Sequence, residues 1–192
     1  MSWASPVTVT PPAEEPVTLA AAKEFVGIEA DEADFDMQLG GFIAAAREHL
    51  ENLTGTRFIE QAVELRADGF ADLERLPIGP VSAVTAIAYD DTAGAEQVLD
   101  DAAYELTGAG LERGVRPVFG GSWPAAARRS GAVRVTATVG YAELPRPLWI
   151  AILQIVADLF AHRETAVTGS IASPVPAALR VEDALANYRI WL

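Results

Sequence analysis

The two histidines of the chain, His49 and His162, are its first candidates for acid–base or metal chemistry. They lie in separate predicted helices, without a His, Asp or Glu at metal-ligand spacing and without a nucleophile motif such as G-x-S-x-G. The chain has no cysteine, which excludes disulfides, thiolate nucleophiles and Cys-ligated zinc or iron–sulfur sites. We therefore predict a protein that is not an enzyme and holds neither a metal nor another cofactor.

Clustered acids and paired glycines form two further patterns, and neither predicts a ligand site. The acids between Glu29 and Asp36 lack the Asp/Asn alternation, the central glycine and the closing glutamate of an EF-hand loop. A helix-capping segment, with acids favoured by the helix dipole, is the simpler interpretation. Gly108, Gly110 and the Gly120–Gly121 pair do not stand between a strand and a helix, as a phosphate cradle requires. We interpret these glycines as turns.

The charge of the chain is unevenly distributed, with a formal total of −13. Most of the acid excess lies before residue 145, and solubility is its simplest explanation. The one basic concentration comprises Arg113, Arg116, Arg128, Arg129 and Arg134. Without a broad basic surface the chain is a poor candidate for tight nucleic-acid binding. Solvated or intersubunit salt bridges are the favoured role for the arginines, with Arg128 and Arg129 as candidate intersubunit contacts.

Helices are expected at both ends of the chain. Residues 1–16 contain four prolines and predict an extended arm rather than a packed element. Thr18 is a suitable N-cap and Gly27 a suitable end for a first helix. Asp31 can cap a second helix, which carries one apolar stripe and ends at Gly55. The Gly40–Gly41 pair inside that helix predicts a bend or a close backbone contact with another helix.

Between these helices the apolar period changes to the alternation of β-strands. Strands are predicted near residues 61–66, 81–89, 96–99, 104–106, 115–119 and 132–141, with a hairpin loop at residues 90–94. Because no crossover helix fits between them, we expect an antiparallel meander.

A third helix is predicted from about Leu148 to Glu164. It is apolar almost all round, apart from a narrow stripe of Gln154, Asp158 and His162. Such a helix needs cover on most sides, which makes Gln154 and Asp158 candidate intersubunit contacts. After a Gly/Ser/Pro spacer, a further helical signal ends on Tyr188, Arg189, Ile190, Trp191 and Leu192. An apolar tail of this kind is expected to dock on its own body or on a partner.

The predicted fold is α+β, with a helical core from both ends of the chain and a small inserted antiparallel β unit. The expected boundaries are an arm over 1–16, a helical core with C-terminal tail over 17–56 and 145–192, and a β subdomain over 57–144. The start of the chain has no signal-peptide pattern, and its longest apolar run falls short of the roughly 20 residues that a bilayer requires. We expect no membrane association.

The order of these elements resembles the head-to-tail connector, or adaptor, proteins of long-tailed phages and of gene transfer agents. The matching segments are PVTLAAAK from Pro16, IAAARE from Ile43, LTG from Leu53, LP from Leu76, PVSAV from Pro80, YEL from Tyr104, SWP from Ser122, AVRV from Ala132, VGY from Val139, AIL from Ala151, RE from Arg163 and YRIW from Tyr188. No single segment is specific, and the resemblance rests on their shared order and spacing over nearly the whole chain after the arm.

The resemblance implies a structural virion protein at the head–tail interface, made in the bacterial cytoplasm. Such adaptors form a ring, expected to be dodecameric, that sits below the portal protein, extends the DNA channel and receives a tail-side head-closure (stopper) protein. DNA would pass through the channel without specific binding. The family commonly engages the portal through its C-terminal segment, which makes residues 188–192 the candidate portal contact.

Two other functions remain open at this stage. A head-closure or tail-completion protein would also be small, acidic and non-catalytic. A more distant alternative is an enzyme or carbohydrate-binding module that uses carboxylates of the β unit.

Overall fold

The computed structural model of the protein describes residues 3–162 and 185–190, and it confirms the predicted α+β class. The chain divides into two compact units. The β unit is formed by the N-terminal residues up to Ala13 together with Gly55–Ala142, and Ile190 also belongs to it. The helical unit is formed by Glu14–Thr54 and the described part of Glu143–Arg189.

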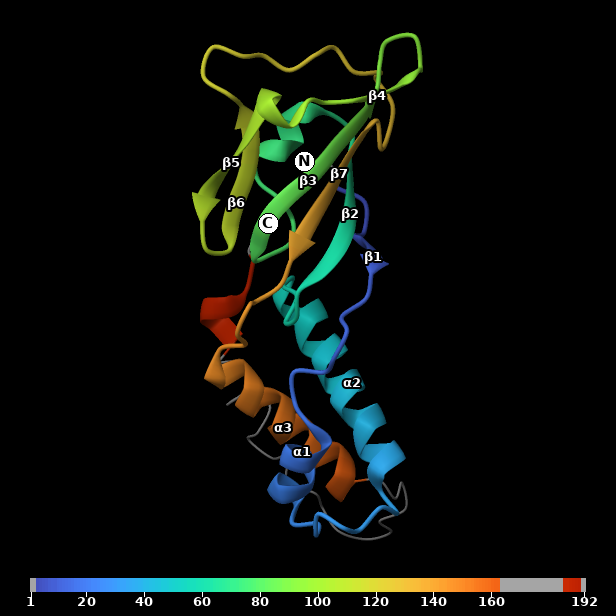
Figure 1. Cartoon of the computed structure of the whole chain (residues 1–192), viewed down its shortest axis with the longest axis vertical. Helices are drawn as coiled ribbons and strands as arrows, with labels where there is room; N and C mark the ends of the chain where they lie inside the picture. Colours follow the sequence, from blue (N-terminus) through green and yellow to red (C-terminus); the bar gives the residue numbers. More distant parts are fainter. Residues whose placement is uncertain (1–2, 163–184, 191–192) are drawn as a thin grey trace, which may run out of the picture. The chain divides into compact units, whose positions relative to one another are not determined.

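Five antiparallel strands make the main sheet of the β unit, in the order β1-β2-β7-β3-β4 (Figure 1). These strands are β1 (Val7–Thr10), β2 (Gln61–Ala67), β3 (Val81–Asp90), β4 (Glu96–Val98) and β7 (Val133–Val139). The last strand of the unit thus pairs with both β2 and β3 and separates them. The expected simple meander is wrong in this respect, because local alternation identifies strands but does not specify which strands pair.

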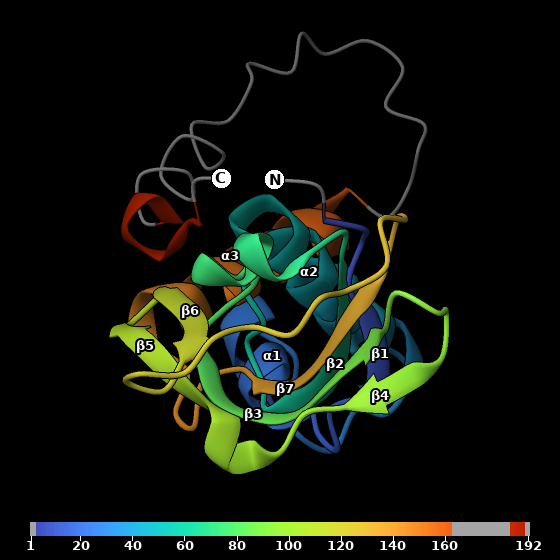
Figure 2. The same ribbon diagram turned by 90° about the horizontal axis from the view of Figure 1, so that it is seen from above.

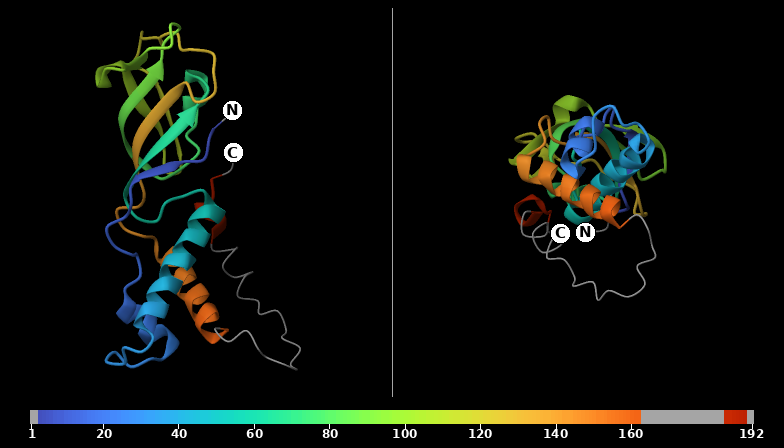
Figure 3. Two further views of the ribbon diagram at one scale, coloured as in Figure 1. Left: turned by 90° about the vertical axis from the view of Figure 1, so that its right-hand side faces the viewer. Right: turned by 90° about the horizontal axis from the view of Figure 1, so that it is seen from below.

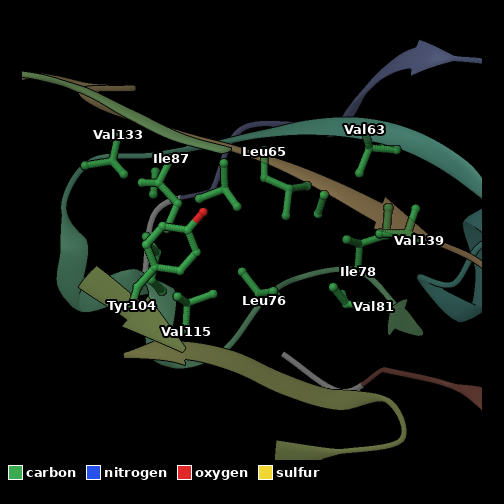
Figure 4. Close-up of a cluster of buried hydrophobic side chains, with 14 of the residues drawn as sticks. Val63, Leu65, Leu76, Ile78, Val81, Ile87, Tyr104, Val115, Val133 and Val139 are labelled. Carbon is green, nitrogen blue, oxygen red and sulfur yellow. The ribbon is translucent and has the colours of Figure 1, made fainter. Parts of the chain in front are cut away.

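A second layer covers one face of this sheet. It consists of the hairpin β5 (Tyr104–Ala109) and β6 (Glu112–Pro117), beside the short 3-10 helices η1 (Phe70–Glu74) and η2 (Asp101–Ala103) (Figure 2). Alternate residues of β7 are buried, as the sequence pattern predicts. Their side chains face Tyr104 and Val115 of the hairpin across the core (Figure 4). Burial of these aliphatic side chains supplies most of the driving force for the fold of this unit.

The N-terminal segment contributes to the β unit, contrary to the expectation of an unpacked arm. β1 pairs antiparallel with β2, and the amide of Ala4 donates a hydrogen bond to the carbonyl of Arg66. Trp3 packs against the hydrophobic core. The prolines on either side of β1 do not prevent this pairing, because β1 is an edge strand and Pro is tolerated at such an edge.

Three helices form the helical unit: α1 (Leu19–Val26), α2 (Asp36–Thr54) and α3 (Arg146–Ala161). α2 packs against α1 and α3, and α1 also packs against α3 (Figure 3). The predicted caps of α1 are confirmed. The Thr18 side chain accepts a hydrogen bond from the amide of Ala21, and Gly27 adopts the left-handed conformation at the C-terminal end.

α2 begins at Asp36 rather than directly after Asp31, because an ordered loop precedes it. Nζ of Lys23 lies 2.5 Å from a carboxylate oxygen of Asp36 and donates hydrogen bonds to the carbonyls of Ala30 and Glu32, at 3.3 and 2.6 Å. Lys23 is buried, and the contacts of its ammonium group hold the acidic loop against α1. Asp36 is the one acid of this cluster in the first turn of α2, and Asp31 lies too far before the helix to be its cap.

The close backbone contact predicted at Gly40 and Gly41 is not found among the residues that the structure describes. Both lie on the exposed side of α2, and a Cβ atom added to either would meet no heavy atom within 4 Å. The sequence cannot distinguish a glycine that makes room for a helix of the same chain from one on an open surface.

Candidate functional site

The candidate portal contact, residues 188–192, begins with the last residue of the 3-10 helix η3 (Ala186–Tyr188). Tyr188 is half-buried and Arg189 is exposed. Trp191 and Leu192 lie outside the described residues. Arg189 has an extended backbone, with φ −94° and ψ 133°, so the chain leaves the helix there.

Ile190 packs on the chain itself. Its Cδ1 atom lies 3.2 Å from the point where a Cβ atom on Gly79 would be, and its Cβ atom lies 3.5 Å from the corresponding point on Gly55. The missing side chain of Gly79 therefore makes room for Ile190, with Leu111 on the same side. Ile190 therefore packs on its own chain, within the β unit.

The candidate contacts Gln154 and Asp158 lie one turn apart on α3. Gln154 is half-buried and Asp158 is exposed. Two large apolar residues of the same helix are also open, Ile150 at 39% and Leu159 at 38% exposure. The described part of the chain therefore leaves some apolar surface of α3 exposed. A partner protein could cover this surface.

Arg129 and Arg134 form ion pairs with an aspartate of their own chain, Asp90. The carboxylate of Asp90, only 3% exposed, accepts hydrogen bonds from Nε of Arg129 at 2.9 Å and from both terminal nitrogens of Arg134 at 3.1 and 3.3 Å. Arg134 also donates to Glu96 at 2.6 Å. Arg128 is exposed. The basic concentration seen in the sequence is thus largely neutralised within the β unit, and Arg128 is the better of the two predicted contact residues.

This network predicts a pH dependence of stability. The hydrogen bonds from Arg134 and then Arg129 lower the pKa of Asp90 below its ordinary value of 3.8. A lowered folded-state pKa gives stability that is present above pH 3.8 and is lost as the pH falls through the folded pKa. In Asp90→Asn, the loss of folding stability that comes from protonation of Asp90 at low pH should disappear. The variant should also be less stable than the wild type at neutral pH. Urea midpoints measured from neutral to acidic pH test this.

The matched control for Asp90→Asn is Glu105→Gln. Glu105 pairs with Arg116 at 2.8 Å, but both side chains are about half or more exposed, so this change should leave the pH profile within error. Equal acid profiles for Asp90→Asn and the wild type would contradict the assignment.

Neither a metal site nor a membrane span is found in the part of the chain that the structure describes. It contains no group of three or more His, Cys, Asp or Glu side chains that could hold a metal ion. None of its helices has the length and apolar character needed to cross a bilayer. His49 and His162 are both exposed, and Nδ1 of His162 lies 2.9 Å from the carbonyl oxygen of Asp158.

Three solved structures share the fold of this chain over nearly its whole length. One is a chain from the virion of a native gene transfer agent particle, with a TM-score of 0.74 and 24% identity over 98% of this chain and 97% of that one. The second comes from the neck of an empty particle computed with C6 symmetry, with a TM-score of 0.70 and 20% identity over 98% and 97%. The third comes from the neck of a native particle computed with C12 symmetry, with a TM-score of 0.64 and 22% identity over 96% and 97%.

These likenesses establish the fold. They extend from end to end of both chains, so the helical unit and the β unit both have counterparts. A scan against known family models and a search of curated proteins give no match.

Sequence reasoning missed one surface, at the turn that follows β6. Phe119 is fully exposed there, at 105%. The sequence pattern predicts a strand over residues 115–119, but β6 ends at Pro117. A signal was available in the sequence, because residues 117–127 contain no charged side chain in a chain of net charge −13.

Proposed function

We propose that this chain is a structural protein of a virion or virion-like particle, and specifically the head–tail adaptor of its neck. The observation that carries the proposal is the full-length likeness to chains from gene transfer agent virions and necks. The sequence resemblance to head-to-tail connector proteins supports the same role independently of the fold comparison. In this role the chain acts by forming contacts with other proteins and not by catalysis.

The ring is proposed to contain twelve copies. One matched neck was computed with C12 symmetry and another with C6 symmetry. A twelve-membered ring satisfies both symmetries because six divides twelve, whereas a six-membered ring satisfies only the lower one. The proposed partners are the portal protein on one side and a tail-side stopper protein on the other, with the DNA channel between them.

The acid excess is compatible with a conduit for DNA. A net charge of −13 per copy disfavours tight contact with phosphates. DNA is therefore proposed to slide through the ring without specific binding.

A head-closure or tail-completion protein is the second candidate, favoured by the neck computed with C6 symmetry. The two roles differ in their direct partner and in ring size. An adaptor binds the portal itself and adds twelve copies, whereas a head-closure protein binds only after the adaptor is present.

The experiment mixes the purified chain with the purified portal protein of the same particle and determines mass and shape by native mass spectrometry and negative-stain imaging. A closed ring of twelve copies on the portal is the expected result. The mixture is the decisive sample, because a ring can require its partner as a template. Absence of binding to the portal protein in every mixture would refute the adaptor role.

The C-terminal segment is tested in the same assay. Substituting both Tyr188 and Arg189 by Ala should weaken portal binding by about 10- to 100-fold, because aromatic and Arg side chains are favoured interface anchors. The thermal unfolding midpoint of the isolated double variant is measured beside the binding assay to check that the variant folds. Deletion of residues 190–192 should in addition destabilise the β unit, because Ile190 packs beside Gly79. Unchanged portal affinity in the double variant would move the portal contact elsewhere on the chain.

A further inference from the structure

The place where Ile190 packs on the β unit is built from residues that are distant in sequence. Gly55 follows the last residue of α2, Gly79 stands two residues before β3, and Leu111 lies in the turn between β5 and β6. A Cβ atom on Gly79 would lie 3.2 Å from Cδ1 of Ile190, and a Cβ atom on Gly55 would lie 3.5 Å from the Cβ atom of Ile190. Two positions without a side chain therefore leave the space that Ile190 fills. We call this place the Ile190 seat.

The backbone of the Ile190 seat is fixed by the β unit itself. Gly79 is buried, and its carbonyl accepts a hydrogen bond from the amide of Arg57 at 2.8 Å. Thr56 forms an isolated parallel bridge with Gly79. The neighbouring Ile78 is 1% exposed and belongs to the hydrophobic core. The seat is therefore a feature of the folded β unit, on which the tail docks.

The segment before Ile190 is short and is also held at its other end. Leu185 is 3% exposed. Residues 186–189 separate it from Ile190, and three of these four residues form η3. A 3-10 helix of this length has little stability of its own. The conformation of residues 186–189 therefore depends on the two anchored ends, Leu185 and Ile190.

The docking of Ile190 also determines which side chains of the tail are presented. Arg189 has an extended backbone. Because side chains alternate in direction along extended backbone, Tyr188 and Ile190 turn to one side and Arg189 turns to the other. In agreement, Tyr188 and Ile190 are half-buried and Arg189 is exposed. With Ile190 in its seat, the two preceding side chains are offered to a partner in one arrangement.

We propose that Gly79 and Ile190 position the two residues before Ile190 for contact with the portal protein. This inference rests on the proposed adaptor function. Ile190 acts through its seat on its own chain and not by touching the portal. A segment that is already ordered loses less conformational entropy when it binds. The free chain therefore carries this part of its portal contact in the bound arrangement.

A disulfide that locks the Ile190 seat tests this inference on the full chain. The protein has no cysteine, so the double variant G55C/I190C contains only the two introduced thiols. The Cβ separation at these positions is 3.5 Å, which lies within the range that a disulfide spans. Gly55 has φ +71°, so the cysteine there lowers stability somewhat. Disulfide formation in the isolated folded chain, measured by mass, tests the seat without the portal.

The portal affinities of the oxidised and reduced forms of G55C/I190C are then compared. The disulfide holds residue 190 in the seat, whereas the reduced form has lost the aliphatic side chain that fills it. The oxidised form should bind the portal about 10-fold more tightly. Any direct contact of the Ile190 side chain with the portal is lost in both forms, so the reduced form is the matched control. The wild-type chain, measured with and without reductant, controls for redox effects on the portal.

A second variant disturbs the seat without changing residues 188–192. Gly79→Ala places a Cβ atom 3.2 Å from Cδ1 of Ile190, which is tighter than an ordinary contact, so this side chain must shift. Portal binding should weaken by about 3-fold. The control is Gly69→Ala, because Gly69 is extended, with φ −167°, and an added Cβ atom meets no heavy atom within 4 Å. Thermal unfolding of both variants verifies that they fold.

The outcomes separate the positioning role from the proposed function. Equal portal affinity of the oxidised and reduced forms, or tighter binding by the reduced form, refutes the positioning role and leaves the adaptor role intact. Failure of the disulfide to form in the folded variant refutes the seat. A wild-type chain that does not bind the portal refutes the adaptor role and the positioning role with it. Tighter binding by the oxidised form, together with weaker binding by Gly79→Ala, supports both.

Discussion

Replacing Gly140 by Ala should lower the free energy of unfolding of the β unit by about 3 kcal/mol or more. Gly140 follows β7 with φ +122°, a conformation that L side chains rarely adopt. An added Cβ atom would overlap the carbonyl oxygen of Ile59 and lie 2.6 Å from the amide nitrogen of Glu60. The backbone cannot move away freely, because the amide of Gly140 donates to the carbonyl of Pro80 at 2.8 Å.

Gly131→Ala is the matched control for Gly140→Ala. Gly131 also has a positive φ, +67°, but the nearest atoms to an added Cβ are those of the Arg66 side chain, at 3.9 and 4.0 Å. Only the conformational penalty applies there, about 1 to 2 kcal/mol. Urea unfolding followed by tryptophan fluorescence measures both variants, because Trp3 and Trp123 pack against the core of the β unit. Equal losses in the two variants would show that crowding at Ile59 has no effect.

Replacing Arg47 by Met should destabilise the helical unit by about 3 to 5 kcal/mol, the usual cost of removing one partner from a buried ion pair. The guanidinium of Arg47 is held by Glu15 through two nitrogens, at 2.8 and 3.2 Å, and by Glu51 at 3.0 Å. Arg47 is 8% exposed and Glu51 is 4% exposed. Burial lowers the pKa of Arg47, but the hydrogen bond to Glu15 and the charges of Glu51, Glu15 and Glu48 raise it overall. Arg47 therefore remains a cation, and its loss removes the ion pair that it forms with the buried carboxylate of Glu51.

A double-mutant cycle separates the charge from the packing in this cluster. Combining Arg47→Met with Glu51→Gln should recover part of the loss, since the remaining buried group is then neutral. Glu48→Gln should cost less than about 0.5 kcal/mol, because exposed ion pairs contribute little, and the Glu48 side chain is 65% exposed at 3.5 Å from Arg47. Helicity at 222 nm across a urea titration reports the unfolding of these helices. Full additivity of the two substitutions would exclude the proposed coupling.

The sequence predicted elements well where a local signal defines them. Thr18 and Gly27 bound α1 because a side-chain oxygen and a left-handed glycine satisfy the free backbone groups at the two ends. The alternation of Val133, Val135, Ala137 and Val139 predicted the buried side of β7. Such signals depend on neighbours within a few residues.

Features that depend on distant pairing were not predictable in this way. Nothing near Val7 indicates that β1 pairs with β2, more than 50 residues later in the sequence. The partnership of Asp90 with Arg129 and Arg134 likewise spans 39 and 44 residues. The packing of Ile190 beside Gly79 depends on the absence of a side chain far away in sequence. Each is a property of the folded topology and not of a local pattern.

The central position of β7 also determines when the β unit can form during synthesis. β2 and β3 leave the ribosome early, but each lacks its shared neighbour until Val139 has emerged. Until then the nascent chain exposes two unpaired strand edges, which are sites of aggregation. The sheet therefore closes in one late step, and a ribosome that stalls between residues 90 and 133 would leave a chaperone-dependent fragment rather than a partly finished domain.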